Sequence, residues 1–167
     1  MELHVVDSNF FIQAHRLNYP LDIALNFWAK VRQLSHDGKI ISIDKVKNEI
    51  YGRNDELENW CQANLPKGFF KDTSTSDVIV EYAKNCSWAV SKGQYTQAAL
   101  NEFLHADEAD AFIAAYTLSD NPNRIVVTQE ISSPESKKRV KLPDACDAHS
   151  VRCVNTVQMF RNIGETF

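Results

Sequence analysis

The sequence predicts one α/β domain over residues 1–167, in which helices cover both faces of a mostly parallel sheet to give three layers. Four short apolar segments alternate with longer segments whose apolar residues recur at helical spacing. Such alternation implies right-handed crossovers and parallel strands. The chain has 167 residues, 44% of them hydrophobic, which suits one core and is short for two domains. Residues around 53–105 are expected to form a helical insertion or clamp.

The predicted strands are short and mostly apolar. They cover residues 3–6, 39–43, 124–128 and 150–154. The segment RIVVT at 124–128 is rich in β-branched residues, as a parallel strand buried on both faces should be. No Gly-rich phosphate loop, GxSxG elbow or HExxH motif is present.

Helices are predicted between these strands. The first begins at the segment ending in Pro20, with proline in its first turn, and stops at Gly38. The next follows Asp44, a plausible N-cap, and ends near Gly52. Later helices are expected near 57–65, 77–91 and 95–104, from Asp107 through FIAAY, and at 156–163.

Composition excludes several classes of protein. Nothing near the N-terminus resembles a signal peptide and no apolar run could span a bilayer, so we expect a cytoplasmic protein with no membrane association. The cysteines form no CxxC pair or His-Cys metal spacing, and we expect them to be reduced core residues. They are Cys61, Cys86, Cys146 and Cys153.

Charge argues against a general nucleic-acid coat protein, because the net charge is −4. It does not exclude a nuclease, since carboxylates that hold metal ions lower the net charge. One basic patch is visible in SKKRVK, which contains Lys137, Lys138, Arg139 and Lys141. Taken alone, this stretch is at least as well explained as a solvated charged loop.

Acidic residues follow the predicted strands. Asp7 comes directly after the first strand, and Glu49 lies one short helical stretch beyond the second. Asp110 lies in the first turn of the FIAAY helix, and Glu130 comes two residues after the third strand. Each has a simple structural explanation, such as an N-cap, a capping pair of Asp107 with Asp110, or an exposed helix or loop acid.

Together these acids indicate a metal site. The carboxyl ends of parallel strands meet at one edge of the sheet, where ligands bind. Several carboxylates gathered there repel one another unless a cation neutralises them. Oxygen ligands without His or Cys suit Mg²⁺ or Mn²⁺, and a pair of such ions roughly 4 Å apart supports in-line phosphodiester displacement. The sequence therefore predicts metal-dependent phosphodiester hydrolysis.

Residue roles follow from that chemistry. Asp7 and Asp110 are expected to ligate the ion, and Glu49 to ligate it or to orient the attacking water. Lys45 or Lys47, on the same short helix as Glu49, is a candidate contact for substrate phosphate, although exposed helix lysines usually contact only solvent.

Four motifs in order resemble the PIN domain family: VVDSNFFI, VKNEI, ADAFIAAY and VVTQE. The stretches FWAKV, LENW, VVTQE and KLPDAC are similar to an uncharacterised prokaryotic PIN-like subfamily related to VapC-like toxin ribonucleases. The resemblance covers nearly the whole chain. It implies a Rossmann-like fold with a Mg²⁺- or Mn²⁺-dependent ribonuclease site at the carboxyl edge of its sheet.

The resemblance also assigns roles by position. Asp7, Glu49 and Asp110 match the three core acids of the family, with Ser8 or Asn9 supporting the first by hydrogen bonds. Thr128 is implied to play a supporting role near the third predicted strand.

The fourth acidic position departs from the family pattern. The commoner pattern is Thr-x-Asp, whereas this chain reads Thr128-Gln129-Glu130. Glu130 is one candidate for this position, and Asp144 in LPDAC, folding back, is another. Asp107 is a third candidate, because residues i and i+3 share a helix face.

The function implied is an endoribonuclease acting as the toxin of a type II toxin–antitoxin pair, with RNA as substrate and a small antitoxin protein as partner. Alternatives are a degenerate PIN-like module that binds RNA or protein without cutting, and a housekeeping RNA-processing or flap nuclease. A homodimer is also expected, in which aromatic residues would provide an apolar patch, although most of these residues are expected to lie in the core. Phe69-Phe70, expected in a loop, is the exception. The other aromatic residues considered are Phe10, Phe11, Tyr19, Phe27, Trp28, Trp60 and Trp88.

Overall fold

The central sheet has five strands, all parallel, in the order β3-β2-β1-β4-β5. The computed structural model describes all of residues 1–167. The strands are β1 (Leu3–Val6), β2 (Ile40–Ile43), β3 (Phe70–Lys71), β4 (Arg124–Val127) and β5 (Cys153–Val154). This arrangement confirms the predicted α/β class.

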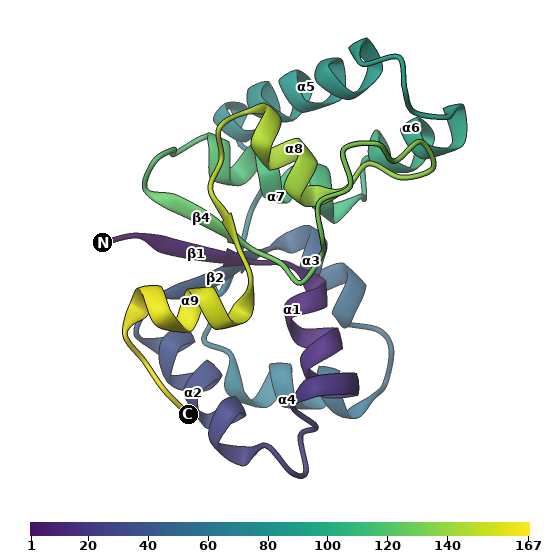
Figure 1. Ribbon diagram of the computed structural model, residues 1–167. Coiled ribbons are helices and arrows are strands. Elements are labelled where there is room, and N and C mark those ends of the chain that lie inside the picture. The colour runs from purple at the N-terminus through teal and green to yellow at the C-terminus, as the bar shows by residue number, and fades with distance from the viewer.

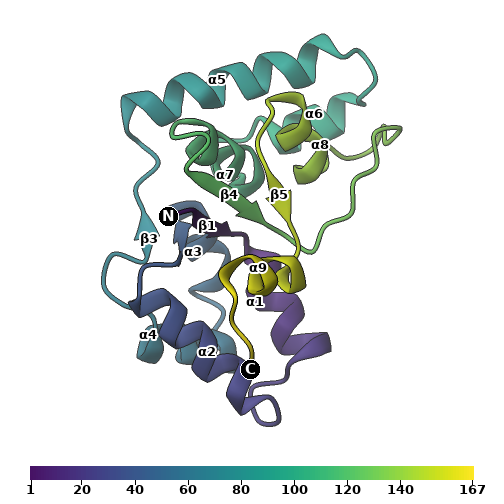
Figure 2. The same cartoon turned by 60° about the vertical axis from the view of Figure 1, so that its left-hand side comes forward.

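Helices cover both faces of this sheet. They are α1 (Ser8–Gln13), which continues as the π-helical segment η1 (Ala14–Asn18), α2 (Leu25–His36), α3 (Asp44–Ile50), α4 (Glu56–Asn64), α5 (Ser76–Ser91), α6 (Gln97–Phe103), α7 (Ala109–Leu118), α8 (Leu142–Ala148) and α9 (Thr156–Ile163). Figures 1 and 2 show α5, α6, α7 and α8 on one side of the sheet, and α1, α2, α4 and α9 on the other. The result is the predicted three-layer, Rossmann-like architecture.

Burial explains the positions of the central elements. Val5 and Val6 of β1 and all three apolar residues of β4 are fully buried, as strands covered on both faces must be. Helix α7 is buried almost all round, because it packs between the sheet, α5 and α8. Its N-terminal turn reaches the carboxyl edge of the sheet and carries Asp110.

Several element boundaries differ from the prediction. The helix expected from Pro20 begins at Leu25, because residues 20–24 form turns closed on the Pro20 carbonyl. Residues 8–18 are helical, which the apolar pattern around Asp7 did not indicate.

Two further elements were missed. Helix α8 lies in a stretch for which no helix was predicted, although Pro143 in its first turn is a helix-start signal. Strand β3 is only two residues long and pairs Phe70 with Ser42 of β2.

The segment 53–105 is therefore not purely helical. It contains α4, α5 and α6, but β3 lies between α4 and α5 and extends the central sheet. Phe69, expected in a loop, is a core residue next to this strand. Five of the nine aromatic residues considered for a dimer surface are buried, so they cannot form an exposed patch: Phe10, Phe11, Phe27, Trp28 and Phe69.

The remaining general predictions concern cysteines and membranes. All four cysteines are free thiols, and two of them, Cys61 and Cys146, are buried. None of the helices combines the length and the apolar character that crossing a membrane requires.

Candidate functional site

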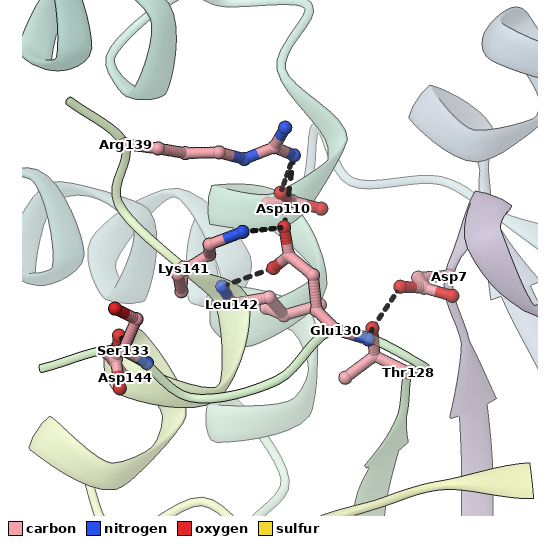
Figure 3. A network of polar contacts seen from close by, with 9 residues as sticks. All are labelled: Asp7, Asp110, Thr128, Glu130, Ser133, Arg139, Lys141, Leu142 and Asp144. Atoms are coloured by element: carbon pink, nitrogen blue, oxygen red, sulfur yellow. Dashed lines mark hydrogen bonds and ion pairs between the residues drawn. The ribbon is translucent and has the colours of Figure 1, made fainter. Parts of the chain in front are cut away.

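Asp7 lies at the carboxyl end of β1, at the centre of the sheet. Its Oδ1 accepts a 2.8 Å hydrogen bond from the backbone N–H of Phe10, which makes Asp7 the N-cap of α1. Its Oδ2 accepts a hydrogen bond from the Thr128 hydroxyl, directly after the neighbouring strand β4 (Figure 3). One carboxylate therefore caps a helix and joins two adjacent strand ends.

Burial raises the pKa of Asp7 to about 7. The hydrogen bonds from Thr128 and Phe10 lower the pKa, whereas the negative charges of Glu130 and Glu49 raise it further. Only 2% of Asp7 is exposed, so water does little to stabilise its ionised form. Asp7 is thus an acid whose charge at neutral pH depends on its immediate surroundings.

Asp110 and Glu130 are joined by a cation. Nη2 of Arg139 lies 3.6 Å from Oδ2 of Asp110 and 3.1 Å from Oε1 of Glu130. Nζ of Lys141 lies 3.8 Å from the same Glu130 oxygen, and the other oxygen accepts a 2.8 Å hydrogen bond from the Leu142 N–H. Figure 3 shows this network beside Asp7, with Asp110 coming from α7 and Glu130 from the loop after β4.

The acidity of Asp110 is perturbed in the same direction as that of Asp7. Burial raises its pKa well above the ordinary value, and the charges of Glu130, Asp7 and Glu108 add to the rise. The Arg139 guanidinium lowers the pKa of Asp110 but does not cancel these effects. Repulsion from both Glu130 and Asp7 means that the three carboxylates influence one another across the sheet edge.

Glu49 is the fourth predicted acid and lies half-buried on α3. Its charge contributes to the raised pKa values of Asp7 and Glu108, although it makes no ion pair of its own. The helix is tied down by Asp44, whose carboxylate accepts hydrogen bonds from the hydroxyl and backbone N–H of Thr73 at 2.7 and 3.3 Å. Asp44 thus anchors α3 to the segment after β3.

The two candidate lysines on α3 point to different places. Nζ of Lys45 lies 4.9 Å from the ring centroid of Phe112, two residues beyond Asp110 on α7. Nζ of Lys47 lies 5.3 Å from the ring centroid of Tyr51, in a separate hollow of about 360 Å³. Only Lys45 therefore contacts the helix that carries Asp110.

Of the residues predicted to support the first acid, Ser8 and Asn9 are not part of this network. Ser8 and Asn9 lie in α1, and neither side chain hydrogen-bonds to Asp7, whose donors are Phe10 and Thr128. The prediction that Thr128 supports the first acid agrees with its hydrogen bond.

Two alternatives for the fourth acidic position lie elsewhere. Asp107 precedes α7, is exposed, and pairs with His105 at 3.9 Å. The shared-face argument for it fails, because the helix begins only at Ala109. Asp144 is buried on α8, where it accepts hydrogen bonds from Ser132 and Ser133 and holds the loop. Of the three candidates, Glu130 is the one beside Asp110.

Comparison with known proteins identifies the family. Residues 4–167 match the model of a family described as a domain of unknown function, DUF4411. The chain belongs to this family. No curated protein gives a significant match. We therefore infer the function of this DUF4411 chain from its site.

The sequence did not identify two charged residues of this DUF4411 site. Arg139 was visible only as part of a basic loop, and nothing in its local pattern indicated that it contacts Asp110. Glu108 is the N-cap residue of α7, and burial raises its pKa. The sequence signal for Glu108 was its position two residues before Asp110, in the acidic segment DEAD at 107–110.

The donor set suits a hard cation, but the side chains do not converge on one point. Five carboxylates (Asp7, Glu49, Glu108, Asp110 and Glu130) influence one another's acidity or share ion pairs, against two cations, Arg139 and Lys141. No three acidic, His or Cys side chains lie close enough together to hold one ion in this conformation. Mg²⁺ or Mn²⁺ thus fits the chemistry of the ligands, but in this conformation Asp110 and Glu130 are paired with Arg139.

Proposed function

We propose that this chain is a metal-dependent endoribonuclease that hydrolyses phosphodiester bonds of RNA. The observation that carries the proposal is a pair of acids at the carboxyl edge of a parallel sheet: Asp7, which is fully buried, and Asp110, which is largely buried. Burial and mutual repulsion raise the pKa of both. Repulsion between neighbouring carboxylates destabilises the folded protein, and a bound divalent cation would relieve it.

The proposed division of roles follows the geometry. We assign Asp7, Asp110 and Glu130 as the candidate ligands, and Glu49 on α3 as a further ligand or as the residue that orients a water. Mg²⁺ or Mn²⁺, when bound, would activate that water and stabilise the charge of the in-line displacement. Thr128 keeps the Asp7 carboxylate oriented, while Lys45, above the Phe112 ring, is available to a substrate phosphate.

Cleavage of labelled RNA by the purified protein tests the proposal. With Mg²⁺ or Mn²⁺ we expect cleavage that EDTA abolishes and that Asp110→Asn lowers by at least about a hundredfold, the scale on which removing a group that stabilises transition-state charge acts. Asp22→Asn is the matched control, since Asp22 is exposed and makes no ion pair. Cleavage that persists in Asp110→Asn would refute the proposed site.

The more specific form of the proposal is a toxin neutralised by a small antitoxin protein. Expression in a bacterium of the wild type and of Asp7→Asn tests it. The wild type should arrest growth and Asp7→Asn should not. Arrest by both proteins, or by neither although both fold, would contradict toxicity by catalysis. A nuclease that passes the RNA assay without arresting growth would instead have a housekeeping role.

A second function is favoured by one observation. Arg139 and Lys141 already pair with the acids, and no three ligands converge. A degenerate module that binds RNA or protein without cutting would have these properties. Calorimetric titration with Mn²⁺ discriminates, because the nuclease must bind the ion at Asp110 and the degenerate module need not.

A further inference from the structure

Arg139 lies among carboxylates from three parts of the chain. Burial lowers the pKa of Arg139, but the four surrounding acids together outweigh it and raise the pKa. They are its ion-pair partners Glu130 and Asp110, with Glu102 and Glu108. A small cavity of about 10 Å³, close to the volume that one water needs, lies between Arg139 and the acids of α6 and α7. The guanidinium is thus the positive centre of the acidic site.

The side chain can leave this position without moving the loop. Residues 128–141 form no helix or strand, but their backbone is fixed near Arg139. The Thr96 N–H donates a 2.8 Å hydrogen bond to the Lys137 carbonyl, and Val140 is buried. The Arg139 side chain itself is 45% exposed, so water can solvate it in another rotamer.

We propose that Arg139 is an exchangeable cation that is transferred from the carboxylates to the substrate. In the metal-free protein it neutralises Asp110 and Glu130. When a divalent ion takes those carboxylates, the guanidinium is released and binds a phosphate group of the substrate. This inference rests on the proposed function and adds to it a phosphate-binding residue whose availability depends on the metal.

The chemistry of the two partners supports the exchange. A divalent ion and a guanidinium cannot both neutralise the same oxygens, and two positive charges in one buried site repel each other. The planar fork of arginine donates paired hydrogen bonds to phosphate as readily as to carboxylate. The released side chain therefore has a matching anionic partner only once substrate is present.

The first test is Mn²⁺ binding measured by calorimetry without nucleotide. Removing the competing charge with Arg139→Gln should tighten Mn²⁺ binding by about tenfold or more, as expected for a unit charge a few ångströms from a divalent ion. Lys138→Gln is the matched control, because it removes the same charge from the adjacent exposed residue, which makes no ion pair. It should leave the affinity unchanged.

The second test is binding of AMP at saturating Mn²⁺. AMP carries a phosphate but no phosphodiester bond, so cleavage does not interfere. Arg139→Gln should weaken its binding by about tenfold, Arg139→Lys by less, and Lys138→Gln not at all. Circular dichroism confirms that each variant is folded, and Arg139→Lys, which retains the charge, serves if the glutamine variant is not.

The outcomes separate the two proposals. Equal Mn²⁺ affinity in the wild type and Arg139→Gln overturns the exchange and leaves the proposed nuclease standing. Tighter Mn²⁺ binding with unchanged AMP affinity overturns the transfer to phosphate. Absence of Mn²⁺ binding in both proteins overturns the proposed function, and this inference with it.

Discussion

Asp7 combines a structural and a chemical role in one side chain. It caps α1 through Oδ1, and through Oδ2 it accepts the Thr128 hydroxyl. Burial nevertheless raises its pKa to about 7. Capping alone would favour the ionised form and lower the pKa, so the site imposes a cost that the cap does not remove.

The raised pKa of Asp7 predicts a pH dependence of stability in the metal-free protein. The unfolded chain releases this proton near pH 4, whereas the folded state holds it up to about pH 7. Between these values the folded state binds more protons, so the free energy of unfolding falls as pH rises. The fall amounts to roughly 1.4 kcal/mol for each unit of pKa difference.

Urea unfolding in EDTA at several pH values measures this effect. Buried His4, whose pKa is lowered by burial, contributes the opposite slope, so the difference between wild type and Asp7→Asn is the informative quantity. Relative to Asp7→Asn, the wild type should lose stability as the pH rises from about 4 to about 7. A difference that stays constant over this range would contradict a raised Asp7 pKa.

Thr128 provides a second prediction for a single residue. Thr128→Val keeps the shape of the side chain but removes the hydrogen-bond donor to ionised Asp7, so it should lower the free energy of unfolding by about 1–3 kcal/mol at pH 8. The loss should be smaller at pH 5.5, where Asp7 is protonated. Thr117→Val is the control, because the buried Thr117 hydroxyl has no partner and its removal should not destabilise. An equal loss at both pH values would mean that Thr128 does not act through the charge of Asp7.

The elements themselves differ in how far sequence could predict them. The elements β1, β2, β4 and α7 have strong local patterns. Asp7 directly follows β1, Glu130 lies in the loop after β4, and Asp110 lies on α7, whereas Glu49 lies on α3, the helix after β2. Strand β3 is set by pairing with β2 and has no pattern of its own at two residues. Helix α8 follows a polar loop, and the proline in its first turn was not interpreted as a helix start.

The acids of the site could be predicted from the sequence, but the contact of Arg139 with them could not. Acids at strand ends follow from topology, since parallel strands bring their carboxyl ends together. The ion pair of Arg139 with Asp110 joins residues 29 positions apart, and its formation depends on how the loop packs against α6 and α7. No local spacing encodes such a contact.

The position of α3, which carries Glu49, depends on one polar anchor. Asp44 at its start accepts both donors of Thr73. We expect Asp44→Ala and Thr73→Val each to lower the free energy of unfolding by about 1–3 kcal/mol, and the double variant to lose less than their sum. Chemical denaturation of the four proteins measures this coupling. Strict additivity would mean that the hydrogen bonds do not hold the helix.

For the whole molecule, the balance of charge at the sheet edge means that metal binding should change the free energy of unfolding. The five carboxylates of the site outnumber its two cations, so ionising all five in the metal-free fold is unfavourable. Any ion that binds the folded state and not the unfolded chain stabilises it. Metal dependence should therefore appear in unfolding, independently of any RNA assay.

We expect Mn²⁺ at about a hundred times its dissociation constant to raise the free energy of unfolding by about 2.7 kcal/mol, and excess EDTA to reverse the gain. Thermal unfolding at pH 7.5, followed by circular dichroism with and without the ion, provides the measurement. Asp110→Asn should be at least as stable as the wild type in EDTA, because it removes a carboxyl group whose ionisation burial makes unfavourable, and it should gain little from Mn²⁺. Asp22→Asn should behave as the wild type in both conditions. A Mn²⁺ gain of equal size in Asp110→Asn would place the ion elsewhere on the protein, and Asp110 would then act in this site without binding metal.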